Sequence, residues 1–162
     1  MRTFELNPDQ LRYYHELSSL PTKNLFYVVV QQKIKGRNYT LTELKKYIRR
    51  AVAYYEKRTN KQTIPYIAIF ETTKEFHMSQ HDLNIVQTEF YSGFHFHLFI
   101  AGVDADFIDD LQWQLNSQRN KRGCISGIDG KFIERFDMDF KTYHLKQMMF
   151  SYSPQLVLSR TQ

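Results

Sequence analysis

The sequence GFHFHLFI occupies residues 93–100, and the interpretation of the whole chain starts from it. Such a run predicts a β-strand, whose successive side chains point to opposite faces of a sheet. One face then carries His95, His97 and Phe99, whereas the other face is apolar and suits a core. Two imidazoles on one face can bind the same metal ion if a neighbouring strand supplies a third ligand. Two hydrogen-bonded histidines on a half-exposed strand are the alternative, so the choice depends on that third ligand.

Composition predicts a globular protein that suits a polyanionic partner. The 162 residues, 42% of them hydrophobic, are enough for one domain, which we expect to span residues 1–162 with a core over about 24–151. Lys and Arg outnumber Asp and Glu by 22 to 17, as in many nucleic-acid-binding proteins. The single cysteine, Cys124, excludes an intramolecular disulfide and indicates a reducing compartment. No apolar run approaches the ~18 residues of a membrane helix, and the first residues lack a signal-peptide core, so we expect an intracellular protein without a membrane anchor.

Two further strands and one helix have strong local signals. The apolar run Leu25–Gln32 predicts a central strand, and Ile64–Glu71 predicts a second strand with Glu71 on the same face as two isoleucines. Thr40 and Glu43 have the spacing of a capping box, which predicts a helix from Thr40 to about residue 57. The other expected elements are helices over residues 7–19, 104–117 (capped by Asp104) and 139–151, strands over 94–101 and 131–138, and a short extra strand over 83–90.

The segment between the expected helix at 104–117 and the last strand contains three glycines and several basic residues. We therefore predict a flexible basic loop over Gln118–Gly130, and a loose tail after Pro154. The resulting order β-α-β-(β)-β-α-β-α predicts an α+β fold, namely a ferredoxin-like (RRM-like) antiparallel sheet of four or five strands with helices packed on one face. In that topology the strands at 25–32 and 94–101 are adjacent and central.

Two glutamates are candidates for the third metal ligand. A hairpin with its turn centred on Ser92 would place Glu89 directly opposite His95, within reach of a shared ion. Glu71, at the end of the preceding strand, is the other candidate. The residues alone leave both open.

Two motifs in this chain resemble those of a known superfamily. His95-Phe96-His97 resembles the histidine-hydrophobe-histidine signature of HUH rolling-circle replication initiators, relaxases and transposases. Tyr143-His144-Leu145-Lys146 resembles the Y-x-x-K motif of the single-tyrosine Rep endonucleases of small circular single-stranded DNA viruses and plasmids. The resemblance covers roughly residues 24–150, although the polar residue usual in the family's first motif is not evident in the strand at 25–32. No P-loop motif is present in these residues, so we expect either an isolated nuclease domain or a stand-alone initiator, for which a separate helicase is a candidate partner.

The resemblance implies a metal-dependent endonuclease and strand transferase. Such an enzyme nicks and rejoins origin DNA, presented as a single strand or a stem-loop, through a covalent 5′-phosphotyrosine, and thereby initiates rolling-circle replication. It implies Tyr143 as nucleophile, with Tyr152 as the fallback, and Lys146 as the residue that stabilises the phenolate or orients the phosphate. His95 and His97 would bind Mn²⁺ or Mg²⁺. The family's acid matches Glu71, whereas hairpin geometry favours Glu89. Localisation would be the cytoplasm of a prokaryote or the host compartment where a viral or plasmid replicon is copied.

The basic residues Arg119, Lys121 and Arg122 are expected to bind DNA phosphates, which would make binding weaken with salt. Two alternative functions remain open at this point. One is a non-catalytic nucleic-acid-binding domain of the RRM type, which shares the sheet topology and would need exposed aromatic residues on its central strands. The other is a transposase or relaxase of the same superfamily.

Overall fold

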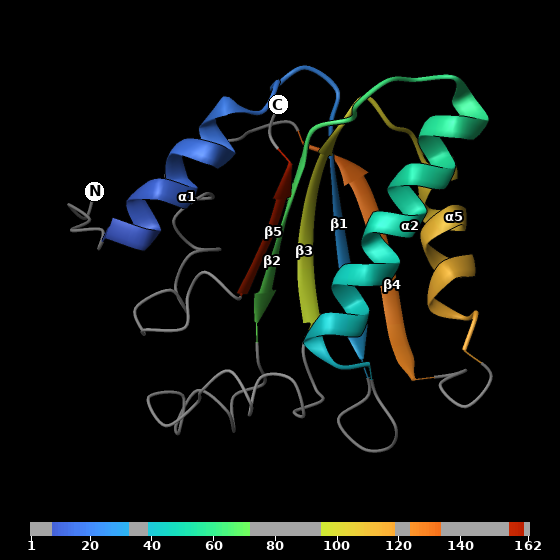
Figure 1. Ribbon diagram of the computed structural model, residues 1–162. Helices are drawn as coiled ribbons and strands as arrows, with labels where there is room; N and C mark the ends of the chain where they lie inside the picture. Colours follow the sequence, from blue (N-terminus) through green and yellow to red (C-terminus); the bar gives the residue numbers. More distant parts are fainter. Residues whose placement is uncertain (1–7, 33–38, 72–94, 119–123, 134–155, 161–162) are drawn as a thin grey trace, which may run out of the picture.

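The computed structural model describes residues 8–32, 39–71, 95–118, 124–133 and 156–160 (Figure 1). Within these ranges no helix is both long and apolar enough to cross a membrane. The elements are, in chain order, α1 (Pro8–Ser19), β1 (Leu25–Gln32), α2 (Leu41–Thr59), β2 (Tyr66–Glu71), β3 (His95–Ala101), α5 (Asp106–Leu115), β4 (Ile125–Phe132) and β5 (Val157–Arg160).

The strands form one five-stranded sheet in the order β4-β1-β3-β2-β5. Every pair of neighbours is antiparallel, and β1 and β3 are adjacent in the middle of the sheet, as predicted. The order β4-β1-β3-β2 is that of a ferredoxin-like fold, to which β5 adds a strand beside β2. The predicted α+β, ferredoxin-like fold class is therefore confirmed.

Helices cover the two faces of this sheet unequally. The crossover helices α2 and α5 pack side by side on one face, in front of the sheet in Figure 1. Helix α1, which precedes the first strand, packs on the opposite face near the β5 edge. Buried residues on the first face include Phe26, Val28, Val30, Tyr66, Ala68, Phe70, Phe96, Leu98 and Ile100. Those on the second face are Tyr13, Leu17, Leu20, Leu25, Tyr27, Ile67, Ile69, Phe99, Ala101 and Val157.

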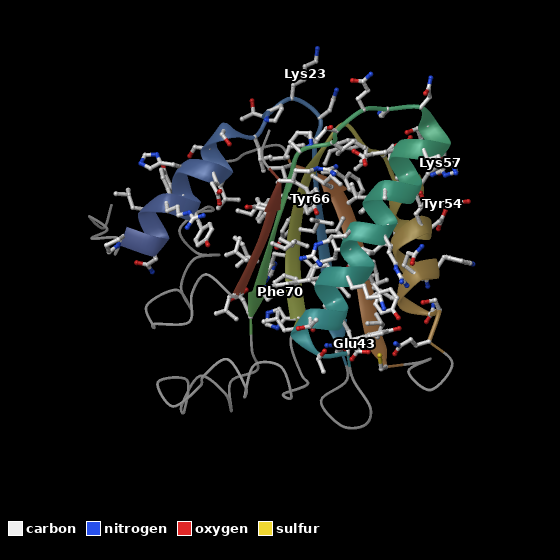
Figure 2. The ribbon with its side chains drawn as sticks, viewed as in Figure 1. Lys23, Glu43, Tyr54, Lys57, Tyr66 and Phe70 are labelled. Atoms are coloured by element: carbon white, nitrogen blue, oxygen red, sulfur yellow. The ribbon has the colours of Figure 1, made fainter. Side chains whose placement is uncertain are left out.

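The capping box predicted for the long helix is present. The side chain of Thr40 accepts a hydrogen bond from the backbone of Glu43, and the Glu43 carboxylate accepts one from the backbone of Thr40. Figure 2 labels Glu43 at this end of α2, and Tyr54 and Lys57 on its exposed side. Asp104 also contributes to the start of the next helix, as predicted: its carboxylate accepts a hydrogen bond from the backbone N–H of Asp106 at 3.0 Å. The residue directly before α5 is Ala105, which makes no side-chain cap bond.

Two predictions about the last third of the chain were wrong. Residues 125–130, expected in a flexible loop, belong to β4 and lie along β1 from Val28 to Gln32. The tail after residue 154, expected to be loose, contains β5, in which Val157 and Leu158 are buried against β2. Residues 83–90, 134–138 and 139–151, where further elements were expected, lie outside the described residues.

The two glycines of β4 allow a matched test of how tightly this strand packs. A Cβ atom added to Gly130 would lie 2.5 Å from Ile108 Cδ1 and 2.8 Å from Phe26 Cε2. We therefore expect Gly130→Ala to lower the free energy of unfolding by about 1–3 kcal/mol through overpacking between β4, β1 and α5. Urea denaturation would measure the change.

Gly127 supplies the control for this substitution. A Cβ atom added there would have no heavy atom within 4 Å, so Gly127→Ala should leave stability unchanged or slightly raised. Equal losses in the two variants would contradict the close approach at Gly130.

Candidate metal centre

Pairing between β2 and β3 brings one carboxylate and two imidazoles to the same place. Glu71 is the last residue of β2 and His95 the first residue of β3, and the two are direct partners in the antiparallel ladder. The next position on this face pairs Ile69 with His97. Because side chains alternate along a strand, Glu71, His95 and His97 all project from the face opposite α2 and α5.

The side chains converge on the Oε1 atom of Glu71. This oxygen lies 2.6 Å from Nε2 of His97 and 3.6 Å from Nε2 of His95. One potential ligand atom from each residue lies within 4.8 Å of the other two. Glu71 is fully buried at 0% exposure, whereas 28% of the His95 side chain is exposed. The group is therefore closed on the Glu71 side and reachable from solvent on the His95 side.

The chemistry of this donor set fits a divalent transition metal ion. A buried carboxylate is costly unless a positive charge or hydrogen bonds compensate it. Two imidazole nitrogens and one carboxylate oxygen suit ions such as Mn²⁺, Fe²⁺ or Zn²⁺ better than they suit Mg²⁺. Moreover, His97 Nε2 and Glu71 Oε1 do not line up as hydrogen-bond donor and acceptor despite the 2.6 Å between them. Such an arrangement is expected of two ligand atoms that are directed at a common third point.

Tyr27, which sequence reasoning missed, contacts this group from β1. Its hydroxyl oxygen lies 2.5 Å from Nδ1 of His97, the ring nitrogen that faces away from Glu71. The rings of Tyr27 and His97 are nearly parallel, with centroids 5.8 Å apart and an interplanar angle of 6°. The alternation of β1 puts Tyr27 on one face in the sequence, but only the register between β1 and β3 places it next to His97.

A shallow hollow lies beside the histidine group on the same face of the sheet. It has a volume of about 540 Å³ and extends over the β1–β4 half of the sheet. Tyr27 belongs to both features, because its ring forms part of the hollow while its hydroxyl contacts His97. The lining residues are Tyr27, Val29, Gln31, Asp129, Gly130 and Lys131.

Of the two glutamates considered from the sequence, Glu71 is the one that the structure brings to the histidines. Glu89 lies outside the described residues. The same holds for the other residues predicted to act in catalysis or DNA binding, which are Tyr143, Lys146, Tyr152, Arg119, Lys121 and Arg122.

Comparisons with protein-family models, with curated proteins and with solved structures found no match for this chain. The class of site is thus defined by its own geometry, as a Glu-His-His group on adjacent strands of a ferredoxin-like sheet.

The group formed by Glu71, His95 and His97 predicts that the protein binds a divalent metal ion. Calorimetric titration of the metal-free protein with Mn²⁺ should show one saturable site. Glu71→Gln, His95→Ala and His97→Ala each remove one of three ligand atoms, so each should weaken binding by more than the roughly 100-fold that loss of a hydrogen bond to a ligand can cause.

His15→Ala is the matched control, because His15 is exposed on α1 and its substitution should leave Mn²⁺ affinity unchanged. Wild-type affinity in all three site variants would place the metal elsewhere.

Proposed function

We propose that this protein is a metal-dependent single-stranded DNA endonuclease and strand transferase of the HUH type, which nicks and rejoins DNA at a replication origin. The observation that carries the proposal is the convergence of Glu71, His95 and His97 on adjacent strands, with both histidines in the order His-hydrophobe-His on a central strand of the sheet. The downstream Tyr143-His144-Leu145-Lys146 motif, known from the sequence, supports the same class.

The charge of the proposed centre suits a phosphodiester. One carboxylate and two neutral imidazoles around a divalent ion leave a net charge of +1, which a phosphate oxygen can neutralise. Three protein ligands also leave coordination positions open, and the exposure of His95 gives access to them from solvent. When bound, the ion would polarise the scissile phosphate and neutralise charge that develops on its oxygens.

The chain's own residues would perform the covalent step. The phenolate oxygen of Tyr143 would form a bond to phosphorus while the bond from phosphorus to the 3′ oxygen of the preceding nucleotide breaks. The leaving oxygen would take up a proton, giving a free 3′ hydroxyl and a 5′-phosphotyrosine. Lys146 would stabilise the phenolate or orient the phosphate. Because the phosphodiester count is conserved, attack by a 3′ hydroxyl on the phosphotyrosine rejoins the strand.

An RRM-type binding domain receives less support than the nuclease. Such a domain stacks bases on exposed aromatic rings of its central strands. On the face that carries the histidines, the aromatic residues of β1 and β3 are Tyr27 and Phe99, which are 9% and 0% exposed. They lie in the cluster that also contains buried residues of α1, so they offer little surface to a base.

Covalent capture tests the proposed reaction. The protein would be incubated with Mn²⁺ and a pool of fully randomised single-stranded oligonucleotides, and adducts resistant to denaturant would be separated on a gel. Wild type should form an adduct that carries DNA on Tyr143, as identified by mass spectrometry of the digested protein. Tyr143→Phe should abolish it because phenylalanine lacks the attacking oxygen.

Two controls separate the steps of this reaction. EDTA and His97→Ala should abolish the adduct through loss of the metal, whereas His15→Ala should not affect it. An adduct that persists in Tyr143→Phe would contradict the nucleophile, and one that persists in EDTA would contradict the role of the metal.

Lys131 adds a prediction about DNA binding outside the chemical step. It is exposed on β4, pairs with Tyr27 across the ladder and lines the hollow beside the histidines. Lys131→Ala should weaken binding of an oligodeoxythymidine and reduce the slope of log affinity against log salt by roughly 0.7, as expected for one lost phosphate contact. Fluorescence anisotropy at several salt concentrations would measure both quantities.

Lys57→Ala is the matched control, because Lys57 is exposed on α2 at the opposite face of the sheet (Figure 2). Equal salt slopes in the Lys131 and Lys57 variants would show that DNA does not follow the hollow.

A further inference from the structure

The contact between Tyr27 and His97 bears on which nitrogen of His97 is available to a metal ion. A neutral imidazole carries one proton, so one ring nitrogen is a donor and the other has a free lone pair. The hydroxyl of Tyr27 lies 2.5 Å from Nδ1 of His97, and a hydroxyl can either donate or accept. The direction of this one hydrogen bond therefore determines the tautomer of His97.

The surroundings of Nε2 favour one direction. If Nε2 carried the proton, its nearest carboxylate oxygen would be Glu71 Oε1 at 2.6 Å, but the two atoms are not aligned as donor and acceptor. If Nδ1 carries the proton, it has the Tyr27 oxygen at 2.5 Å as acceptor. The second arrangement leaves the Nε2 lone pair directed into the space that Glu71 and His95 also face.

We infer that Tyr27 is a positioning residue, which accepts a hydrogen bond from Nδ1–H of His97 and so presents Nε2 to the metal. The inference rests on the proposed metal centre. Histidines that bind metals generally donate their other N–H to a neighbouring acceptor, which fixes both the tautomer and the ring orientation. Tyr27 supplies such an acceptor from a strand that contributes no ligand itself.

Packing holds the Tyr27 hydroxyl in this place. Tyr27 is 9% exposed, and its ring stacks on Phe99 with centroids 5.0 Å apart and lies nearly parallel to the His97 ring. In the β1–β3 ladder Tyr27 pairs with Phe99 and Val29 pairs with His97, so the Tyr27–His97 contact is a diagonal one across the two strands. Diagonal neighbours are within reach of aromatic side chains, and the ladder fixes their separation.

Tyr27→Phe removes only the hydroxyl and tests the inference directly. We expect a 10- to 100-fold loss of Mn²⁺ affinity by calorimetry, the range found when such supporting hydrogen bonds are removed. Tyr66→Phe is the matched control, because Tyr66 is also buried in the same sheet but packs on the face covered by α2 (Figure 2). Its Mn²⁺ affinity should equal that of wild type.

The tautomer itself supplies a readout that a merely structural role would not move. Long-range ¹H–¹⁵N spectra of the metal-free protein, at a pH where imidazoles are neutral, distinguish Nδ1–H from Nε2–H. Wild type and Tyr66→Phe should show His97 protonated at Nδ1, and Tyr27→Phe should shift it towards the Nε2–H form.

The outcomes separate this inference from the proposed function. Wild-type Mn²⁺ affinity in Tyr27→Phe, or an Nε2–H tautomer in the wild-type protein, would overturn the role of Tyr27 while leaving the metal centre and the nuclease in place. Absence of saturable Mn²⁺ binding in wild type would overturn both. Mn²⁺ binding that depends on Tyr27 in a protein that forms no DNA adduct would retain the inference and overturn the nuclease.

Discussion

The register between β2 and β3 is the constraint on which the candidate centre depends. Glu71 faces His95 directly, and Ile69 faces His97. Because the side-chain period of a strand is two, a slip of one residue would turn Glu71 towards α2 and bring an apolar neighbour to the histidines. The group would then cease to exist, although the sheet could still form. The proposed function therefore requires this particular pairing of β2 with β3, and not only the presence of the three residues.

Residues on the opposite face of the same two strands fix this register. Phe70 and Phe96 are direct partners in the ladder, both fully buried, with ring centroids 5.5 Å apart under α2. A slipped register would remove these rings from the core and cost the free energy of burying them, about 1.5–3 kcal/mol for each side chain. The helices thus influence the face that carries the candidate centre, since they pack against the residues that alternate with Glu71, His95 and His97.

Sequence patterns within one segment were sufficient to predict the elements that depend on that segment alone. The alternation around His95 and His97 predicted their strand, and Thr40 predicted the start of α2. Distant contacts explain what was missed. The sequence predicted a loop at Gly130. A glycine fits this strand position because Ile108 and Phe26, which lie elsewhere in the chain, approach it closely. The four-residue strand β5 depends on pairing with β2, and Tyr27 meets His97 only through the β1–β3 register.

The pairing of β5 with β2 determines which strand forms this edge of the described sheet. An outermost strand exposes unpaired N–H and C=O groups, which can recruit a second molecule and start aggregation. β5 takes this outer position beside β2, so the strand that ends in Glu71 is not the edge of the described sheet. The new edge is short and ends in Arg160, whose guanidinium pairs with Glu56 at 2.7 Å and donates to the Ile64 carbonyl. A short edge strand and a charged edge residue both discourage edge-to-edge pairing. β5 thus covers β2, the strand that supplies the carboxylate of Glu71.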